Sequence, residues 1–218
     1  MLALFWITSV MCLAPYCLQA QRPRPCASPP LYMGNLFVST KEVELWAVAN
    51  YAYDAFNQRL HLRDTGNFMN KSFSHDVLML FQEGLRYNIN HANQTCVKEA
   101  LQSDFHPMAV PKSASFLSQV VLGTSSTPGQ GLLVNTWWGD VRESEGDGHY
   151  VMSFTELSCL PVSGLFYTED KRWISVSFYN NFLGIDDPNR FIPPPFCKDA
   201  EVERDIHGGV TDFFSILQ

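Results

Sequence analysis

Short apolar runs, several of them alternating with polar residues and most of them closed by turn residues, recur along this chain. In residues 174–178, Ile, Val and Phe occupy alternate positions with serines between them, so they point to one face of a strand. No apolar pattern of helical period continues for more than a few turns. The sequence therefore predicts a mainly β protein in which some strands are wet on one face.

The predicted strands follow one another with mostly short connections. Their ranges are 43–53, 60–63, 77–81, 85–89, 132–138, 150–157, 164–168 and 173–179. Gln82, Glu83 and Gly84 form the turn of one predicted hairpin. Residues 105–123 contain two prolines before an apolar run, which fits a crossing loop with either a short helix or a strand. No repeat or charged linker divides the chain, so we expect one domain over residues 21–218.

Two of these runs, residues 77–81 and 132–134, have apolar side chains at consecutive positions. A strand of this kind has two apolar faces, so it either packs between two layers or lines an apolar cavity. Ordinary core packing is the commoner of the two. Trp137, Trp138 and Trp173 allow the same two interpretations, as core residues or as side chains that stack on a ligand.

The first twenty residues contain no charged side chain, and they are apolar from residue 2 to residue 13. Pro15 interrupts this stretch, and Ala20 supplies a small residue for cleavage, so residues 1–20 are predicted to be a secretory signal peptide. A signal anchor is the alternative, but the run is shorter than the ~20 residues of a spanning helix. No later stretch is long and apolar enough to predict a transmembrane segment.

Four cysteines remain after residues 1–20 are removed, and an even count in a secreted chain predicts two disulfides. They are Cys26, Cys96, Cys159 and Cys197. Their spacing leaves all three pairings open. Three consecutive prolines at 193–195 make the segment before Cys197 stiff and extended, so we expect this cysteine to tether a C-terminal arm to the body.

Surface features narrow the range of partners. Asn70 and Asn93 each begin an Asn-X-Ser/Thr sequon without proline, and both are predicted glycosylation sites. The formal net charge of −7 disfavours nucleic acid and anionic membrane surfaces. One acidic segment offers the oxygen ligands that calcium prefers, although a solvated loop is commoner. Its candidate ligands are Asp140, Glu143, Glu145 and Asp147.

Catalytic motifs are not found in the sequence. It contains no GxSxG, HExxH, GxGxxG or phosphate-binding loop, and its six histidines are scattered. Asp186 and Asp187 could serve a glycosidase only if they faced each other, and adjacent acidic residues before Pro188 are more typical of a turn. We therefore expect neither an enzyme nor an organic cofactor.

Several motifs in one order carry a resemblance to a known family. They are RPCASPPLYMGN around Cys26, SHDVLMLFQEGLRYNI from residue 74, NQTCVKE around Cys96, CLPVSG at Cys159 and DDPNRFIPPPFC at Cys197. Together with the two sequons, these motifs resemble the ependymin family over nearly the whole of residues 21–218.

The resemblance implies a fold of strongly curved antiparallel β-sheets that enclose an apolar pocket, with a few short helices. This fold is similar to that of bacterial lipoprotein carriers. The resemblance also implies a homodimer, glycans on both sequons, and disulfides Cys26–Cys159 and Cys96–Cys197. It favours the cavity interpretation of residues 77–81, in which only alternate side chains can face the cavity. Two sets are open, Leu78 with Leu80 or Val77 with Met79 and Phe81. The ligand-pocket candidates are Leu78, Leu80, Ile174, Val176 and Phe178.

The function implied by the resemblance is that of a secreted, non-enzymatic glycoprotein in the extracellular space or the lysosomal lumen. It would bind an amphipathic lipid or another hydrophobic ligand, bind calcium partly through its glycans, and contact cells and extracellular matrix. The alternative is an adhesion or matrix component with no small-molecule ligand.

Overall fold

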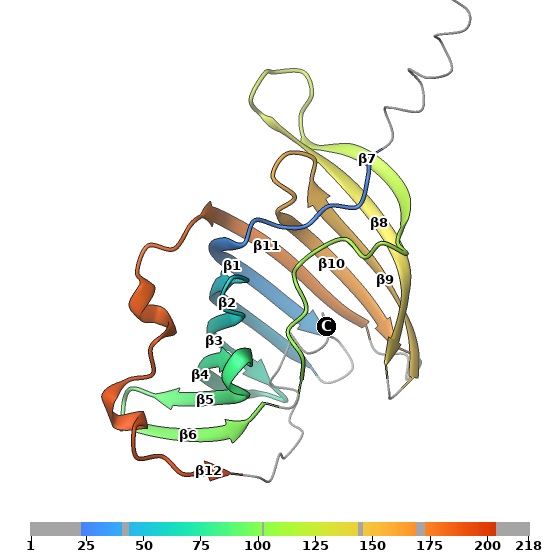
Figure 1. Cartoon of the computed structure of the whole chain (residues 1–218). Helices are drawn as coiled ribbons and strands as arrows, with labels where there is room; N and C mark the ends of the chain where they lie inside the picture. The colour runs from blue at the N-terminus through green and yellow to red at the C-terminus, as the bar shows by residue number, and fades with distance from the viewer. Residues whose placement is uncertain (1–22, 41–43, 102, 144–145, 169–172, 204–218) are drawn as a thin grey trace, which may run out of the picture.

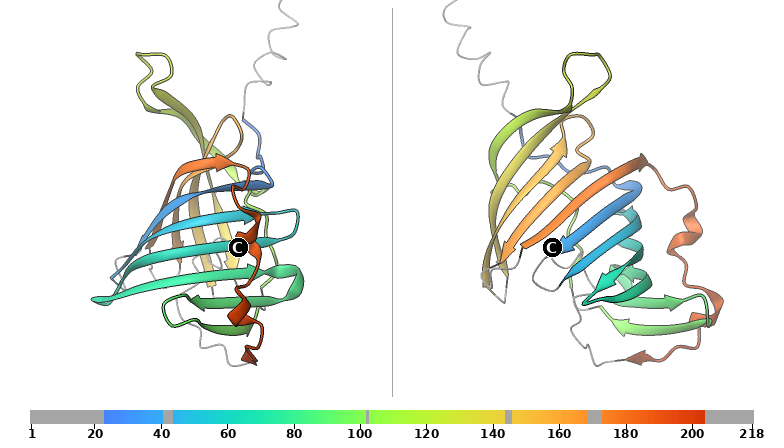
Figure 2. Two further views of the ribbon diagram at one scale, coloured as in Figure 1. Left: turned by 90° about the vertical axis from the view of Figure 1, so that its left-hand side faces the viewer. Right: turned by 180° about the vertical axis from the view of Figure 1, so that it is seen from behind.

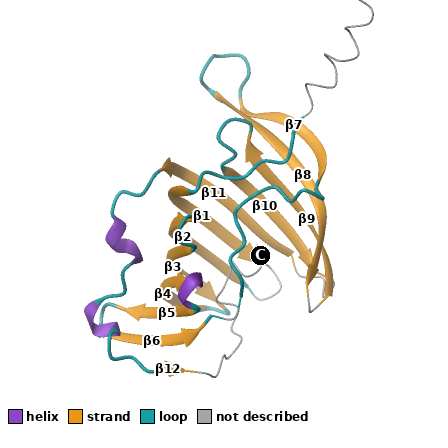
Figure 3. Ribbon diagram, in the orientation of Figure 1, coloured by secondary structure: helices purple, strands orange, loops and turns teal. Residues whose placement is uncertain are grey.

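The computed structural model describes residues 23–40, 44–101, 103–143, 146–168 and 173–203, and strands dominate this part of the chain. The strands are β1 (Leu31–Thr40), β2 (Leu45–Asp54), β3 (Arg59–Phe68), β4 (Lys71–Leu80), β5 (Leu85–Asn90), β6 (Thr95–Ala100), β7 (Ser115–Gly123), β8 (Gly131–Glu143), β9 (Gly146–Thr155), β10 (Pro161–Thr168), β11 (Trp173–Leu183) and β12 (Val202–Glu203). The described helices are the short 3₁₀ turns η1 (Phe81–Glu83), η2 (Pro188–Phe191) and η3 (Pro195–Cys197) (Figure 3). The prediction of a mainly β fold is confirmed.

One twelve-stranded sheet contains these strands in the order β12-β6-β5-β4-β3-β2-β1-β11-β10-β9-β8-β7. Neighbouring strands are antiparallel, except that the two-residue β12 runs parallel to β6. Figures 1 and 2 show the sheet curving strongly between β6 and β7, so that it has a concave and a convex face. We call these the inner face and the outer face. The predicted curved antiparallel sheet is present.

The inner face carries the larger buried apolar cluster, with residues from β1 to β4 and from β8 to β11. Residues 103–114, which we call the strap, cross this face between β6 and β7 (Figure 1). Met108 and Val110 of the strap join the cluster, and Phe105 stacks on Tyr53 at 5.8 Å between ring centres. The ambiguous range 105–123 is therefore a crossing loop followed by a strand.

The outer face carries a smaller cluster beneath the segment that follows β11. This segment, residues 184–200, contains η2 and η3, and we call it the arm (Figure 2). Phe191 and Cys197 of the arm pack with Leu78, Leu80 and other residues of the outer face. The prolines of the arm therefore lie outside the sheet, where their missing backbone donors cost nothing.

The two disulfides lie on opposite sides of the sheet. Cys26 pairs with Cys159, between β9 and β10, at a Cα–Cα distance of 6.0 Å, and the next residue, Ala27, forms an antiparallel bridge with Ala109 of the strap. Cys96 pairs with Cys197 at 5.1 Å and joins the arm to β6. The pairing that the family resemblance implied is confirmed, and so is the prediction that Cys197 tethers the arm.

Some elements differ from the prediction. β1 and β6 were not predicted, and β3 and β4 extend well beyond the predicted ranges. The predicted signal peptide, residues 1–20, lies outside the described residues. Within the described ranges, no helix has the length and apolar character that a membrane crossing requires.

Candidate functional site

The inner face brings β11 and β1 together as one apolar wall. Phe178 lies opposite Leu36, and Val176 lies opposite Val38, in the antiparallel register of these strands. Ile174 precedes Val176 by two residues and points to the same face. All of these side chains are buried in the larger cluster. Three of the predicted pocket residues, Ile174, Val176 and Phe178, therefore share the inner face.

Leu78 and Leu80 do not share that face, so their assignment to the same pocket is wrong. Both are buried in the smaller cluster of the outer face, beneath the arm. Val77 and Met79, the alternate residues of β4, point instead into the inner cluster. Because side chains of a strand alternate between faces, only the second set can line a site together with β11.

Tyrosines place a few polar groups within the inner face. The Tyr51 hydroxyl lies 2.6 Å from Asn181 Oδ1, and the Tyr53 hydroxyl accepts the Met108 N–H at 2.9 Å. Burial raises the pKa of both hydroxyl groups, so they stay neutral at physiological pH. The inner face is therefore a mainly apolar surface with hydrogen-bonding groups at a few positions, a composition that is common in ligand sites.

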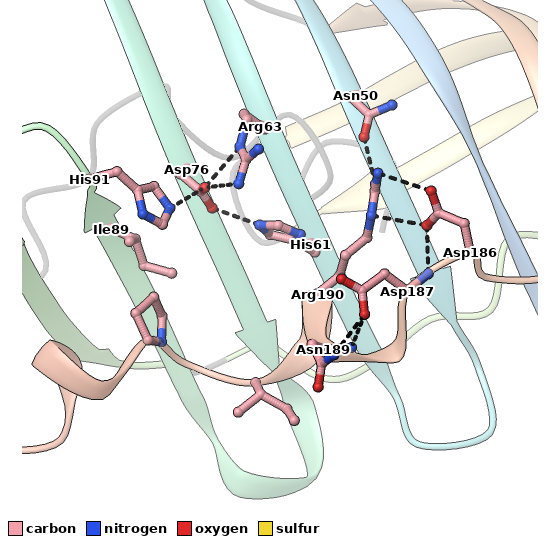
Figure 4. Close-up of a pocket in the computed structure, with 12 residues that line it drawn as sticks. Asn50, His61, Arg63, Asp76, Ile89, His91, Asp186, Asp187, Asn189 and Arg190 are labelled. Atoms are coloured by element: carbon pink, nitrogen blue, oxygen red, sulfur yellow. Dashed lines mark hydrogen bonds and ion pairs between the residues drawn. The ribbon is translucent and has the colours of Figure 1, made fainter.

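A second candidate site, a polar pocket of about 410 Å³, lies between the outer face and the arm (Figure 4). It is lined by Asn50, His61, Arg63, Asp76, Ile89, His91, Asp186, Asp187, Asn189, Arg190, Ile192 and Pro194. The sheet residues come from β2 to β5, and residues 186–194 belong to the arm. The proline-rich arm therefore forms one wall of this pocket.

Asp76 is the centre of the polar pocket, and only 5% of its surface is exposed. Its Oδ1 lies 2.6 Å from His61 Nε2, and its Oδ2 accepts hydrogen bonds from Arg63 at 2.7 and 2.9 Å. His91 Nε2 lies 3.0 Å from the same Oδ2. Burial raises the pKa of Asp76, but His61 and Arg63 outweigh it and lower the pKa to about 2. The carboxylate is thus ionised and fully paired.

The arm side of the pocket is held by similar pairs. Arg190 donates to Asn50 Oδ1 at 2.7 Å, and its Nε lies 3.2 Å from Asp186 Oδ1. Asp187 caps η2 by accepting the Asn189 N–H at 2.9 Å. The turn interpretation of Asp186 and Asp187 is therefore correct.

The lining of the pocket offers charge, hydrogen bonds and the two imidazoles of His61 and His91. Among its described lining residues there is no Ser, Thr, Cys or Lys nucleophile, and Asp76 is too acidic and too well paired to act as a general base. Sequence analysis missed this network. The available signal was the two-residue spacing of His61 and Arg63 in a strand, which places both side chains on one face.

The predicted calcium ligands lie at the hairpin between β8 and β9. Asp140 is exposed and lies 2.7 Å from His149 Nδ1. In the backbone register of the hairpin, Glu143 lies opposite Gly146 and Asp147 lies opposite Arg142. Glu145 lies outside the described residues. Among the residues that the structure describes, no three His, Cys, Asp or Glu side chains gather as metal ligands.

Both sequon asparagines lie at exposed hairpin turns. Asn70 lies between β3 and β4, and Asn93 lies between β5 and β6. Asn93 Oδ1 accepts a hydrogen bond from the Thr95 hydroxyl at 2.6 Å within its own sequon. Glycosylation at these two positions stays a prediction, and their exposure is the condition that it requires.

Comparison with solved structures shows the fold alone. The chain is similar to an uncharacterized conserved protein from Thermus thermophilus, with a TM-score of 0.50 and 12% sequence identity. The match covers 84% of this chain and 91% of that protein.

Comparison with known sequences shows the family. The family model described as Ependymin matches residues 69–197. The chain is 34% identical to Ependymin-2 of Carassius auratus and 35% identical to Ependymin of Notemigonus crysoleucas. Each match covers 88% of this chain and 88% of the relative. The sequence motifs, both disulfides and these matches agree, and the chain belongs to the ependymin family.

Proposed function

We propose that this protein is a secreted, non-enzymatic glycoprotein that binds the apolar part of an amphipathic lipid on the inner face of its sheet. The observation that supports the proposal is the curved apolar wall of the inner face, to which both halves of the sheet contribute side chains. Such a wall can take up an acyl chain with a gain of about 0.8 kcal/mol for each buried CH₂ group.

Exposed apolar side chains extend this wall beyond the buried cluster. Phe116 of β7 is 37% exposed and lies edge-on to the buried Trp137, with 5.4 Å between ring centres. Val121 and Leu133 lie opposite each other further along the same hairpin, and each is about 40% exposed. These residues offer an acyl chain a surface from which to enter the inner face.

Lipid extraction tests this proposal. Protein purified from a secreting cell is extracted with organic solvent, and the extract is analysed by mass spectrometry. We expect co-purified lipid, and we expect delipidated protein to bind a fluorescent fatty acid that excess lipid displaces. Protein that carries no lipid and takes up no probe would overturn the proposal and leave the adhesion function.

The outer face also presents a surface that supports association with another protein chain. The outer face exposes a group of large apolar side chains away from the arm, namely Phe37, Trp46, Val48, Trp138, Val151, Leu165 and Trp173. Trp46, Leu165 and Trp138 lie in one line of directly opposite residues that runs across the neighbouring strands. Apolar groups of this kind mark interaction surfaces.

A second copy of the chain is the partner that we propose for this outer surface, in a symmetric homodimer. Sedimentation analysis of Trp46→Ser tests it, with Phe56→Ser as the matched control at a 68% exposed position between β2 and β3. We expect the first change alone to yield monomers. A Trp46→Ser protein that remains dimeric would place the interface elsewhere.

Calcium binding, partly through the glycans on Asn70 and Asn93, is also proposed. The support is the exposure of both sequons and of the carboxylate of Asp140. Sialidase treatment before calorimetric calcium titration separates the two sources of ligands. Loss of binding identifies the glycans, and retained binding that Asp140→Asn abolishes identifies the β8–β9 hairpin.

A further inference from the structure

Two polar atoms are buried without a hydrogen-bond partner on the β8–β9 part of the inner wall. They are Trp137 Nε1 and the Tyr150 hydroxyl oxygen, and neither has a protein partner among the described residues. Trp137 is 2% exposed and Tyr150 is 5% exposed. A buried donor without a partner costs about 1–3 kcal/mol, so each one in a folded protein calls for a physical explanation.

The sheet register places these two side chains next to each other. Trp137 lies opposite Met152, and Gly139, two residues further along β8, lies opposite Tyr150. The pair is therefore a diagonal neighbour pair on one face. A Cβ atom at position 139 would lie 2.5 Å from the Tyr150 hydroxyl oxygen, so the glycine leaves the space that the hydroxyl occupies.

The Tyr32 hydroxyl, on β1 of the same inner face, is a third buried polar group without a partner among the described residues, whereas other polar groups of the molecule are paired. On the same inner face, the hydroxyl groups of Tyr51 and Tyr53 both have partners, at 2.6 and 2.9 Å. On the outer face, Asp76 is paired by three side chains. Of the residues that carry the unpartnered groups, Trp137 is the one that contacts the exposed Phe116.

We propose that Trp137 Nε1–H and the Tyr150 hydroxyl donate hydrogen bonds to a neutral carbonyl group, such as that of an ester or amide, in the polar end of the bound lipid. This inference rests on the proposed lipid-binding function and specifies the chemical class of its ligand. Each donor would exchange its unpaired state for a bond to the ligand, while the acyl chain lies along the apolar wall.

The charge around the two donors favours a neutral acceptor over a carboxylate or phosphate. The register neighbours on the inner face are Phe116, Met152 and Phe166, and none of them is cationic. Burial raises the pKa of Tyr150, and the nearby carboxylate of Asp140 raises it further. The hydroxyl therefore remains a donor at neutral pH.

Ligands of similar length but different polar ends test the proposal. Delipidated protein is loaded with the neutral fluorophore Nile red, which is displaced by methyl decanoate, by decanoate or by undecane. We expect methyl decanoate to bind about tenfold more tightly than undecane, which corresponds to one buried hydrogen bond, and more tightly than decanoate. Equal affinities for all three would overturn the proposal.

Tyr150→Phe removes the hydroxyl and keeps the ring. We expect it to reduce the preference for the ester over undecane severalfold and to leave the affinity for undecane unchanged. The matched control is Tyr53→Phe, which removes a hydroxyl that already has a partner and should keep the full ester preference. An unchanged preference in Tyr150→Phe would overturn the assignment of this donor.

Trp137→Phe is the second variant, and it should show the same reduced preference, since Phe cannot donate. Two failures remain distinct in these experiments. Wild-type protein that binds neither Nile red nor any of the three ligands contradicts the proposed function itself. Wild-type protein that binds all of them, with a preference that neither variant changes, contradicts only the carbonyl site.

Discussion

Two strand segments with consecutive apolar residues have opposite surroundings in this protein. Residues 77–80 of β4 are 0–4% exposed on both faces. At the end of the β7–β8 hairpin, Val121, Leu122, Leu132 and Leu133 are 40–47% exposed on both faces. A two-faced apolar pattern therefore specifies what a strand can bury and leaves open whether anything covers it.

The difference follows from the position of each segment in the sheet. β4 lies between β3 and β5, with the inner cluster on one side and the arm on the other. β7 is the last strand of the sheet, and β8 pairs with β9 only from Val134 onward. The end of this hairpin is a two-stranded ribbon without a covering layer. Natural proteins normally protect such an edge from pairing with other chains by placing charged residues or proline on it. β12, the opposite edge, is two residues long.

The largest expected effect is that of a charge in the covered segment. Met79→Asp and Leu80→Asp should both cost more than about 4 kcal/mol, because each places an unpaired carboxylate in a buried cluster. We therefore expect neither variant to be secreted, whichever face it occupies. From the sequence alone, the family resemblance predicted that one face of residues 77–81 lines a pocket. Secretion of either variant with wild-type thermal stability would show that its face of β4 is open.

The arm that covers β4 is expected to have the next largest effect. Replacing Cys96 and Cys197 together by Ala should lower the free energy of unfolding by about 2–5 kcal/mol. It should also increase amide hydrogen exchange in β4, since Leu78 and Leu80 lose their cover. Unchanged exchange in β4 would mean that the arm stays in place without the disulfide.

β4 also contains a buried charge, Asp76, next to its apolar residues, and removing this charge tests how it is stabilised. Asp76→Asn should lower the free energy of unfolding by about 3 kcal/mol at pH 6, because His61, Arg63 and His91 lose their shared carboxylate. Asp140→Asn is the matched control, since the Asp140 side chain is 63% exposed in its pair with His149. That change should cost under about 0.5 kcal/mol.

The pH dependence of this difference has a defined sign. The pKa of Asp76 is lowered to about 2 in the folded protein, so its contribution to stability is present above the ordinary carboxyl pKa of about 4. Between about pH 4 and pH 2 the wild-type protein should lose about 2 kcal/mol more than Asp76→Asn. Denaturant unfolding over this range measures it. Parallel curves for the two proteins would contradict the depressed pKa.

The smallest effect is expected at the exposed end of the β7–β8 hairpin. Leu132→Asp and Leu133→Asp should each change the free energy of unfolding by about 0.5 kcal/mol or less, since both residues are already largely in water. Denaturant unfolding measures the change. A loss above about 2 kcal/mol would show that the hairpin is covered in solution, and the comparison with β4 would then fail.

Much of the fold follows from local sequence patterns. The alternation of Ile174, Val176 and Phe178 with serines correctly predicted a strand with one buried face. β1 was not predicted, because Gly34 and Asn35 are residues typical of turns. In the structure its side chains nevertheless alternate strictly between buried and less buried positions. In the structure a Cβ at Gly34 would collide with Asn181 Oδ1, so this glycine is needed for the Tyr51–Asn181 contact. The need for glycine at position 34 therefore comes from Asn181 in β11, which is distant in the sequence.

The candidate sites depend on contacts that local sequence patterns do not predict. Sequence analysis placed Leu78 with Phe178, and the structure separates them by the thickness of the sheet. It also missed the ion pairs of Asp76, because His61 and Arg63 meet that carboxylate only through the register of β3 with β4. The unpartnered donors on Trp137 and Tyr150 could not be predicted, since a lack of partners is a property of the whole packed wall.

By itself, the sequence determined the β class, the apolar faces of single strands and the need to pair four cysteines, because these depend on residues a few positions apart. The family resemblance then selected the pairing of those cysteines. Only the tertiary structure decided which apolar face is covered. The cover comes from segments as distant as the arm, tied through a disulfide that spans 101 residues, and the period of two in a strand carries no information about such contacts.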